Sequence, residues 1–155
     1  MLAVIIANWF IVSKSVTLNR LSQTQGQLES VLKNLPGAAM TVTWPPGATG
    51  ESEDDTVFFL NKDACFQIWG VHANEAEIDI KAIRDRNEVS DSTVALNTKI
   101  VASSHSMRSW HTIWLTRTPP GELRWLEARG TPLRKQNGSL TWTTRVFDPH
   151  PPHTL

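Results

Sequence analysis

The first 35 residues constrain the fold most, because they can form one long helix. Residues 2–35 contain no proline and a single glycine, Gly26, and the pair Pro36-Gly37 ends the stretch. This pattern predicts an unbroken helix of 34 residues, about 50 Å long at about 1.5 Å per residue. A helix of that length extends far beyond what one small domain can cover.

Apolar side chains recur along this helix at alternating steps of three and four residues, the heptad pattern of a coiled coil. Lys14 and Gln25 interrupt the core positions, and a polar core residue favours two strands and fixes their register. An amphipathic helix folded back over its own domain is the alternative, but it needs a wider apolar stripe. We therefore predict a homodimer whose helical seam contains Leu18, Leu21, Gln25, Leu28, Leu32 and Leu35.

Composition and charge exclude several classes of protein. Fifteen Lys and Arg balance fifteen Asp and Glu, so the basic surface of a nucleic-acid-binding protein is missing, and we expect no nucleic acid as partner. The single cysteine, Cys65, excludes an internal disulfide and a thiolate zinc cluster. A reducing compartment fits this composition, and we expect a cytoplasmic location.

The apolar run at residues 2–12 is too short to cross a bilayer by itself. It holds eleven residues and is interrupted by Asn8, whereas a spanning helix needs about twenty. It also lacks the basic start and the cleavage site of a signal peptide. The run can be the cytoplasmic end of a membrane anchor, in which case the protein is the cytoplasmic part of a membrane-anchored sensor.

Beyond Pro36-Gly37 the pattern predicts an α+β domain of short strands, short helices and three longer strands. Turn residues punctuate the last part, where Pro119-Pro120-Gly121 and Asn137-Gly138 favour hairpins. Asn61 can cap a helix that ends at Gly70. We expect strands at 39–44, 56–60, 109–118, 122–130 and 139–147, helices at 61–70 and 91–103, and one or two helical turns within 73–83.

The last three strands are apolar on both alternating faces. Trp110 and Trp114 oppose Ile113 and Leu115 in the first of them, and an antiparallel sheet with one wet face does not normally show this pattern. One face covers the short helices. The other face needs a second cover, which we expect the N-terminal helix or a partner subunit to supply.

Several segments together resemble the PAS (Per-Arnt-Sim) family, in the subgroup with a C-terminal PAC motif. Asn61 with Phe66-Gln67-Ile68-Trp69-Gly70 looks like the first helix of that family, and Phe147-Asp148 looks like its terminal Asp-Ile-Thr. The hairpin Pro120-Gly121-Glu122-Leu123-Arg124-Trp125-Leu126 resembles its aspartate-glycine-x-x-arginine-tryptophan motif, and Gly130-Thr131-Pro132 with Asn137-Gly138-Ser139 resembles its last turn. The similarity covers residues 28–148.

The resemblance implies a five-stranded antiparallel sheet flanked by short helices, preceded by the long N-terminal coiled-coil helix. It divides the chain into a signalling and dimerisation helix at 1–35, a PAS domain at 36–148 and a tail at 149–155. It also implies that Asp148 relays a signal to a downstream helix. Two departures are present: Pro149-His150 replaces Ile-Thr and resists a continuing helix, and Ile113-Trp114-Leu115 replaces a strand segment that commonly carries Glu and Arg.

The resemblance also implies a pocket between the sheet and the short helices. We expect it to be lined by Phe66, Trp69, Ile113, Leu115, Leu126 and Ala128, with His111 or Arg124 as an orienting polar group. Tryptophan and phenylalanine side chains can fill such a space outright, and this interpretation, a filled core, is slightly favoured over an open cavity. The acidic run at 51–55 is most simply a solvated loop.

The sequence identifies no cofactor, no metal site and no catalytic residue. No histidine pair with metal-binding spacing occurs, and the predicted helix at 91–103 lacks the histidine that haem-binding PAS relatives place there. Cys65 lies outside the cysteine motif of flavin-binding relatives and is expected to be a buried structural thiol. We expect neither haem nor flavin.

The function that these patterns favour is a non-enzymatic sensory and dimerisation module of a bacterial-type signal transduction protein. By resemblance, it would regulate a histidine kinase or a diguanylate cyclase, with a small apolar organic molecule as a candidate ligand. Two alternatives stay open. One is a small-molecule-binding or catalytic α+β cavity protein, and the other is a structural dimerisation module without a ligand.

Overall fold

The computed structural model describes residues 20, 22–28, 30, 36–118 and 121–149. The chain divides into two units, Met1–Leu35 and Pro36–Leu155. In the first unit, residues 22–28 are helical and Leu28 is 57% exposed. The seam residues Leu18, Leu21, Leu32 and Leu35 and the apolar run at 2–12 lie outside the described residues, so the coiled coil and the membrane anchor stay predictions.

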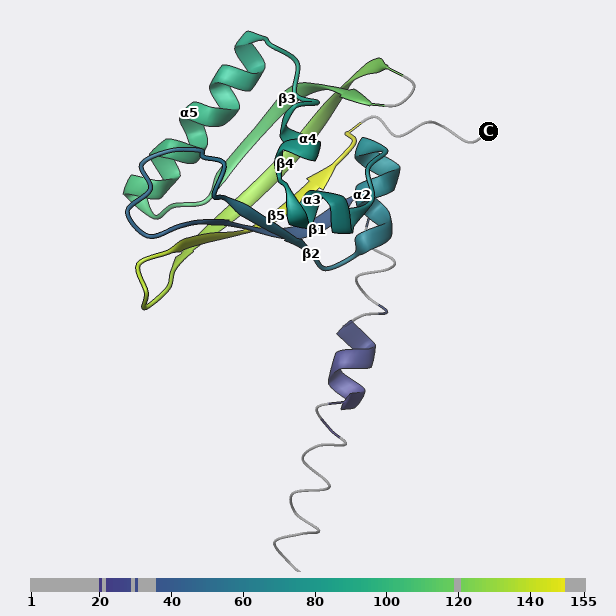
Figure 1. Cartoon of the computed structure of the whole chain (residues 1–155). Helices are drawn as coiled ribbons and strands as arrows, with labels where there is room; N and C mark the ends of the chain where they lie inside the picture. The colour runs from purple at the N-terminus through teal and green to yellow at the C-terminus, as the bar shows by residue number, and fades with distance from the viewer. Residues whose placement is uncertain (1–19, 21, 29, 31–35, 119–120, 150–155) are drawn as a thin grey trace, which may run out of the picture. The chain divides into compact units, whose positions relative to one another are not determined.

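The second unit is built on one five-stranded antiparallel sheet, which confirms the predicted fold class (Figure 1). Its strands lie in the order β2-β1-β5-β4-β3. The first and last strands of the chain are central neighbours, and Ala38 pairs with Val146. The strands are β1 (Ala38–Trp44), β2 (Thr56–Phe59), β3 (Trp110–Thr118), β4 (Glu122–Arg134) and β5 (Leu140–Phe147).

Four helices connect β2 to β3 and contribute to a single apolar core with one face of the sheet. The longest ends three residues later than predicted, because Met107 adopts a left-handed conformation (φ 57°) and its N–H bonds to the Ser103 carbonyl. The helices are α2 (Lys62–Trp69), α3 (Ala73–Ile78), α4 (Lys81–Arg84) and α5 (Asp91–Ser106).

Side chains alternate between a buried inner face and an exposed outer face of the sheet. In β3, Trp110 and Trp114 are buried whereas Ile113 is 43% exposed. Leu123 and Trp125 of β4 are also about half exposed on the outer face. The expected sheet with apolar residues on both faces is therefore present, and the second cover for its outer face stays a prediction.

Asn61 joins the start of β1 to the start of α2. It lies at the N-cap position of α2, as predicted, but its side chain makes no capping bond to the helix. Instead, its Oδ1 accepts from the Ala39 N–H at 2.7 Å and its Nδ2 donates to the Gly37 carbonyl at 2.8 Å. The side chain thus satisfies two backbone groups where the chain enters the sheet.

Replacing Asn61 with alanine should lower the free energy of unfolding by about 1–3 kcal/mol, because it leaves a part-buried N–H and carbonyl without these partners. Urea denaturation followed by circular dichroism measures the change. The matched control is Gln67→Ala, an exposed position in α2 that should shift the unfolding midpoint little. Equal effects of the two substitutions would contradict the role given to Asn61.

Candidate functional site

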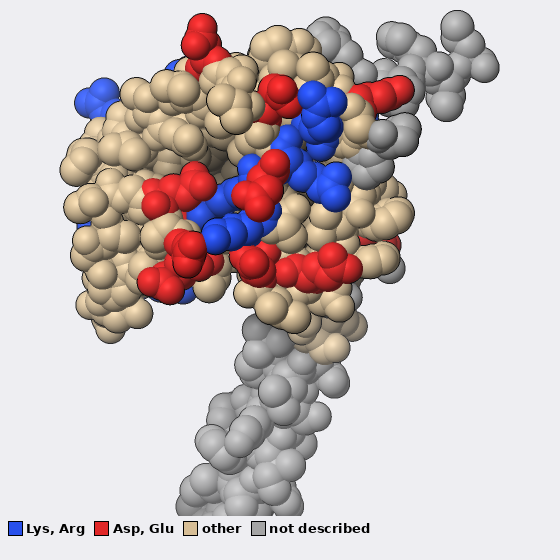
Figure 2. Space-filling view, turned by 45° about the horizontal axis from the view of Figure 1, so that its top comes forward, with Lys and Arg blue, Asp and Glu red and all other residues tan. Residues whose placement is uncertain are grey.

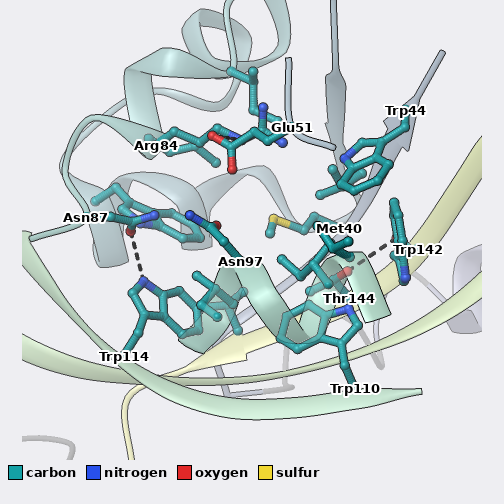
Figure 3. A pocket seen from close by; sticks show the side chains of 18 residues that line it. Met40, Trp44, Glu51, Arg84, Asn87, Asn97, Trp110, Trp114, Trp142 and Thr144 are labelled. Carbon is teal, nitrogen blue, oxygen red and sulfur yellow. Dashed lines mark hydrogen bonds and ion pairs between the residues drawn. The ribbon is translucent and has the colours of Figure 1, made fainter. Parts of the chain in front are cut away.

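A cavity of about 370 Å³ lies between the inner face of the sheet and helices α4 and α5 (Figure 3). Pockets for small molecules usually measure about 300 to 1,000 Å³. Aliphatic side chains of α4, α5 and the sheet form part of its wall. All the aromatic side chains in the described lining are tryptophans: Trp44, Trp69, Trp110, Trp114 and Trp142.

Hydrogen bonds hold two of these indoles at the cavity wall. The Trp114 Nε1–H donates to Asn87 Oδ1 at 2.8 Å, and the Trp142 Nε1–H donates to Ser103 Oγ at 3.0 Å. Trp44 packs edge-on against Trp142, with ring centroids 4.7 Å apart. A buried indole N–H needs a partner, and both partners lie on segments that cover the inner face of the sheet, so the two bonds join the sheet to its cover. The interior thus contains an open cavity, where the composition slightly favoured a filled core.

Trp110 is fixed in another way, by lying over Gly130 on the neighbouring strand. A Cβ atom on Gly130 would meet the indole at 2.4 Å from Nε1 and 2.6 Å from Cε2, so only glycine leaves room for the ring. Trp110 is 8% exposed, and within the described residues its buried Nε1–H has no hydrogen-bond partner. Figure 3 shows this nitrogen on the side of the ring that faces Thr144.

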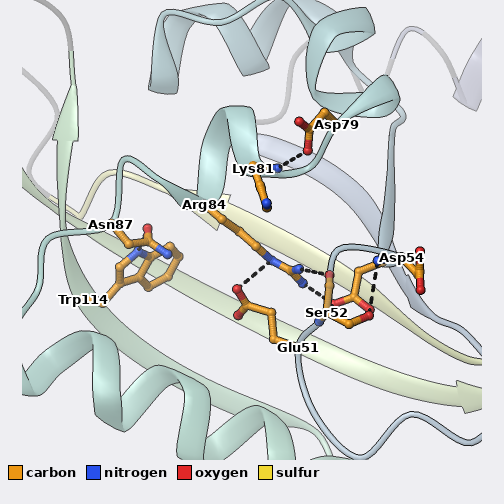
Figure 4. Close-up of polar contacts among 9 residues, drawn as sticks. Glu51, Ser52, Asp54, Asp79, Lys81, Arg84, Asn87 and Trp114 are labelled. Atoms are coloured by element: carbon orange, nitrogen blue, oxygen red, sulfur yellow. Dashed lines mark hydrogen bonds and ion pairs between the residues drawn. The ribbon is translucent and has the colours of Figure 1, made fainter.

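Charged groups gather at the rim of the cavity around Arg84 (Figure 4). Its Nη2 lies 2.8 Å from Asp55 Oδ2, its Nε lies 3.3 Å from Glu51 Oε1, and its Nη1 donates to the Ser52 carbonyl at 3.1 Å. These bonds tie the loop between β1 and β2 to α4. The Asp55 carboxylate is fully buried and also accepts from the N–H and hydroxyl of Ser52, so the expectation of a merely solvated acidic loop is wrong for Asp55.

A second ion pair joins the same loop to the same helix. Lys81 Nζ lies 2.6 Å from Glu53 Oε1, and that hydrogen bond raises the pKa of Lys81. Both side chains are exposed, so the pair contributes little to stability. Acidic and basic side chains also intermix across the face that Figure 2 displays, where no broad patch of one sign is visible.

The structure brings together only part of the predicted pocket. Trp69 lines the cavity. Leu126 and Ala128 are buried on the inner face of β4, but outside the cavity lining. Ile113 and Leu115 lie on the opposite face, because the two-residue period of a strand that turns Trp114 inward turns both its neighbours outward. Assigning them to the pocket was therefore a wrong choice of face.

The remaining predicted pocket residues also lie elsewhere. Phe66 is 52% exposed and stacks on the His72 ring. His111 is on the outer face, where its Nε2 lies 3.0 Å from Glu127 Oε2. The Arg124 guanidinium bonds to the carboxylate of Asp148, with Nε 3.1 Å from Oδ2. This ion pair positions the proposed relay residue, whose relay role stays a prediction.

Sequence reasoning missed Trp44, Trp110, Trp114, Trp142, Glu51, Arg84, Asn87 and Asn97 as cavity residues. One signal for them was present: Trp110 and Trp114 are four residues apart in a strand and therefore share a face. No local pattern predicts the ion pair between Glu51 and Arg84, because the two residues are 33 positions apart in the chain.

Cys65 is a buried thiol in α2, as expected. Burial raises its pKa to about 11, and the negative charges of Glu77 and Glu75 add to the increase. The thiol is thus protonated at neutral pH and is a poor nucleophile.

Within the described ranges, no cluster of three or more His, Cys, Asp or Glu side chains could hold a metal ion, and no helix is long and apolar enough to cross a membrane.

Replacing Gly130 with alanine should push the Trp110 ring off the sheet and into the cavity, because the new Cβ overlaps the indole. We expect the free energy of unfolding to fall by about 1–3 kcal/mol. Denaturation monitored by tryptophan fluorescence measures it. Gly50→Ala is the control, since nothing lies within 4 Å of a Cβ at that position. A Gly130 variant as stable as the control would argue against the packing of Trp110 over this glycine.

Comparison with known proteins gives the fold a name. The sequence matches no protein-family model, and the search of curated proteins gave no match. Among solved structures, a PAS domain from Colwellia psychrerythraea is similar with a TM-score of 0.51 and 15% identity, over 84% of this chain and 98% of that chain. The PAS domain of an HTR-like protein from Haloarcula marismortui gives a TM-score of 0.51 and 17% identity, over 86% and 99%.

An RNA-binding light-oxygen-voltage receptor is also similar, with a TM-score of 0.52 and 12% identity over 72% of this chain. The similar region spans only 29% of that receptor. All three identities are low, so the likeness concerns the fold. The segments that resemble PAS motifs, the five-stranded sheet and these neighbours agree: the globular part of this chain is a PAS fold.

Proposed function

We propose that this chain is a non-enzymatic sensory module of a signal transduction protein and that it binds a small organic molecule in the cavity. The observation that carries the proposal is the cavity itself: about 370 Å³ in the interior of a PAS fold, with five indoles in its wall. Apolar surface of this kind is poorly hydrated, so an organic occupant is favoured over water.

The proposal includes a homodimer formed through the N-terminal helix. Its support is the heptad pattern, together with the half-exposed apolar side chains Leu123 and Trp125 on the outer face of the sheet. Binding in the cavity would favour one of two packings of the sheet and thereby change the register or splay of the seam. The output would be a histidine kinase or a diguanylate cyclase in the cytoplasm, with or without a membrane anchor.

A catalytic cavity is less well supported. The catalytic alternative predicts a carboxylate that projects into the cavity, and Glu127 is the strand residue that the sequence offers for that role. Glu127 instead lies beside His111 on the outer face of the sheet. Glu51, the carboxylate at the cavity rim, is paired with Arg84. A structural module without a ligand is the other alternative, and native mass spectrometry separates it from a sensor.

Native mass spectrometry of protein purified without added ligand should show an adduct of a few hundred daltons or less that denaturation releases, since about 370 Å³ admits only a small molecule. Ile100→Trp should abolish the adduct, because Ile100 lines the cavity. Val94→Trp, an exposed position on the same helix, should retain it. Wild-type protein without any adduct would favour the structural module, and an adduct kept by Ile100→Trp would place binding elsewhere.

Replacing Leu21 and Leu28 together with aspartate should give a monomer in analytical ultracentrifugation, because two charges at core positions of the seam cannot be buried against a second helix. The control pair, Gln23→Asp with Ser30→Asp, adds the same charge at positions outside the predicted seam and should leave a dimer. A tight dimer of the leucine variant would remove the seam from the mechanism.

A further inference from the structure

The rim of the cavity has an excess of negative charge. Glu51 and Arg84 are the only charged side chains in the described lining, and the Arg84 guanidinium also binds the buried carboxylate of Asp55. One positive group thus faces two negative groups. Three of the five N–H groups of Arg84 already bond to Glu51, Asp55 and Ser52, so the positive charge of the guanidinium is compensated within this loop.

The wall of the cavity is rich in π-electrons. Indole is the side chain whose ring face attracts a cation most strongly, and the attraction grows when water is excluded. Trp110 has one ring face over Gly130, which leaves its other face for the interior. Trp114 and Trp142 have their N–H groups bonded to Asn87 and Ser103, so these positive edges are not offered to an occupant.

One buried donor in the wall lacks a partner. The Trp110 Nε1–H has no acceptor within the described part of the chain, although the residue is only 8% exposed. Buried donors in folded proteins are almost always paired, and each exception needs an explanation. An oxygen or nitrogen acceptor on a molecule in the cavity would satisfy this N–H group.

We propose that the cavity binds a small organic cation, a quaternary or protonated amine, which also carries a hydrogen-bond acceptor. Its positive group lies among the indoles on the side of Glu51, and its acceptor takes the Trp110 N–H. This inference rests on the proposed function, because it names the class of ligand for the same cavity. A quaternary amine and a neutral molecule of the same shape differ only in charge, so a comparison of their affinities tests the inference directly.

The test compares two probes by isothermal titration calorimetry of the full chain. The cation (4-hydroxyphenyl)trimethylammonium and the neutral 4-tert-butylphenol have the same shape, and both offer a hydroxyl oxygen to Trp110. We expect the cation to bind about tenfold more tightly than the neutral probe. Glu51→Gln should reduce that ratio to about two or less. Glu53→Gln is the matched control, since Glu53 lies in the same loop but outside the lining, and it should keep the wild-type ratio.

Trp110→Phe tests the second half of the inference. It keeps an aromatic ring but removes the N–H, so it should weaken the neutral probe by about threefold or more, and the cation at least as much because phenylalanine attracts a cation less strongly than indole does. Unchanged affinity for both probes would show that Trp110 makes no hydrogen bond to the occupant.

The wild-type comparison decides the proposal even if a variant fails to fold. Equal affinity for the two probes, or tighter binding of the neutral one, would overturn the cation preference while leaving the cavity a binding site. Binding of neither probe, together with protein that carries no adduct in native mass spectrometry, would overturn the proposed function as well.

Discussion

Two hydrogen bonds from buried indoles join the sheet of this domain to the segments that cover its inner face. Trp114 finds its acceptor on Asn87, in the segment between α4 and α5, and Trp142 finds its acceptor on Ser103 of α5. Both bonds draw the rings against the elements that surround the cavity. Two polar side chains outside the sheet thus fix the orientation of two of the five indoles in the cavity wall.

The rim depends on a different kind of bond. Arg84 joins a short helix to the loop between β1 and β2, and its partner Asp55 is completely buried. A buried carboxylate is costly unless hydrogen bonds and an opposite charge compensate it, and here Ser52 and Arg84 provide both. An ion pair therefore holds the loop beside the cavity, together with the packing of Ala48 against the core. This arrangement places the Glu51 carboxylate next to the tryptophans of the cavity wall, and the proposal of a cationic ligand follows from these two neighbouring groups.

The sequence predicted the positions of the strands and helices well, but it did not predict which face of each strand points toward the helices. Turn residues such as Asn137-Gly138 and the glycine that ends α2, Gly70, act locally, so they located the strands and the end of helix α2. Which side of β3 faces the helices is a tertiary property, and both its faces are apolar. The choice of the wrong face of β3 therefore put His111, Ile113 and Leu115 in the predicted pocket and left Trp114 out. The bonds of Arg84 and Asn61 connect positions far apart in the chain, and no spacing rule predicts them. The predicted seam lies mainly outside the described residues.

The pairing of Ala38 with Val146 has a consequence for how such a domain is built into a larger protein. The polypeptide enters and leaves the sheet at adjacent points, so the whole unit can be inserted into a host chain with little change in the path of that chain. Moving the unit to another host chain requires a single insertion point in that chain. A mechanical change at that point acts on β1 and β5 together, and both strands contribute to the wall of the cavity.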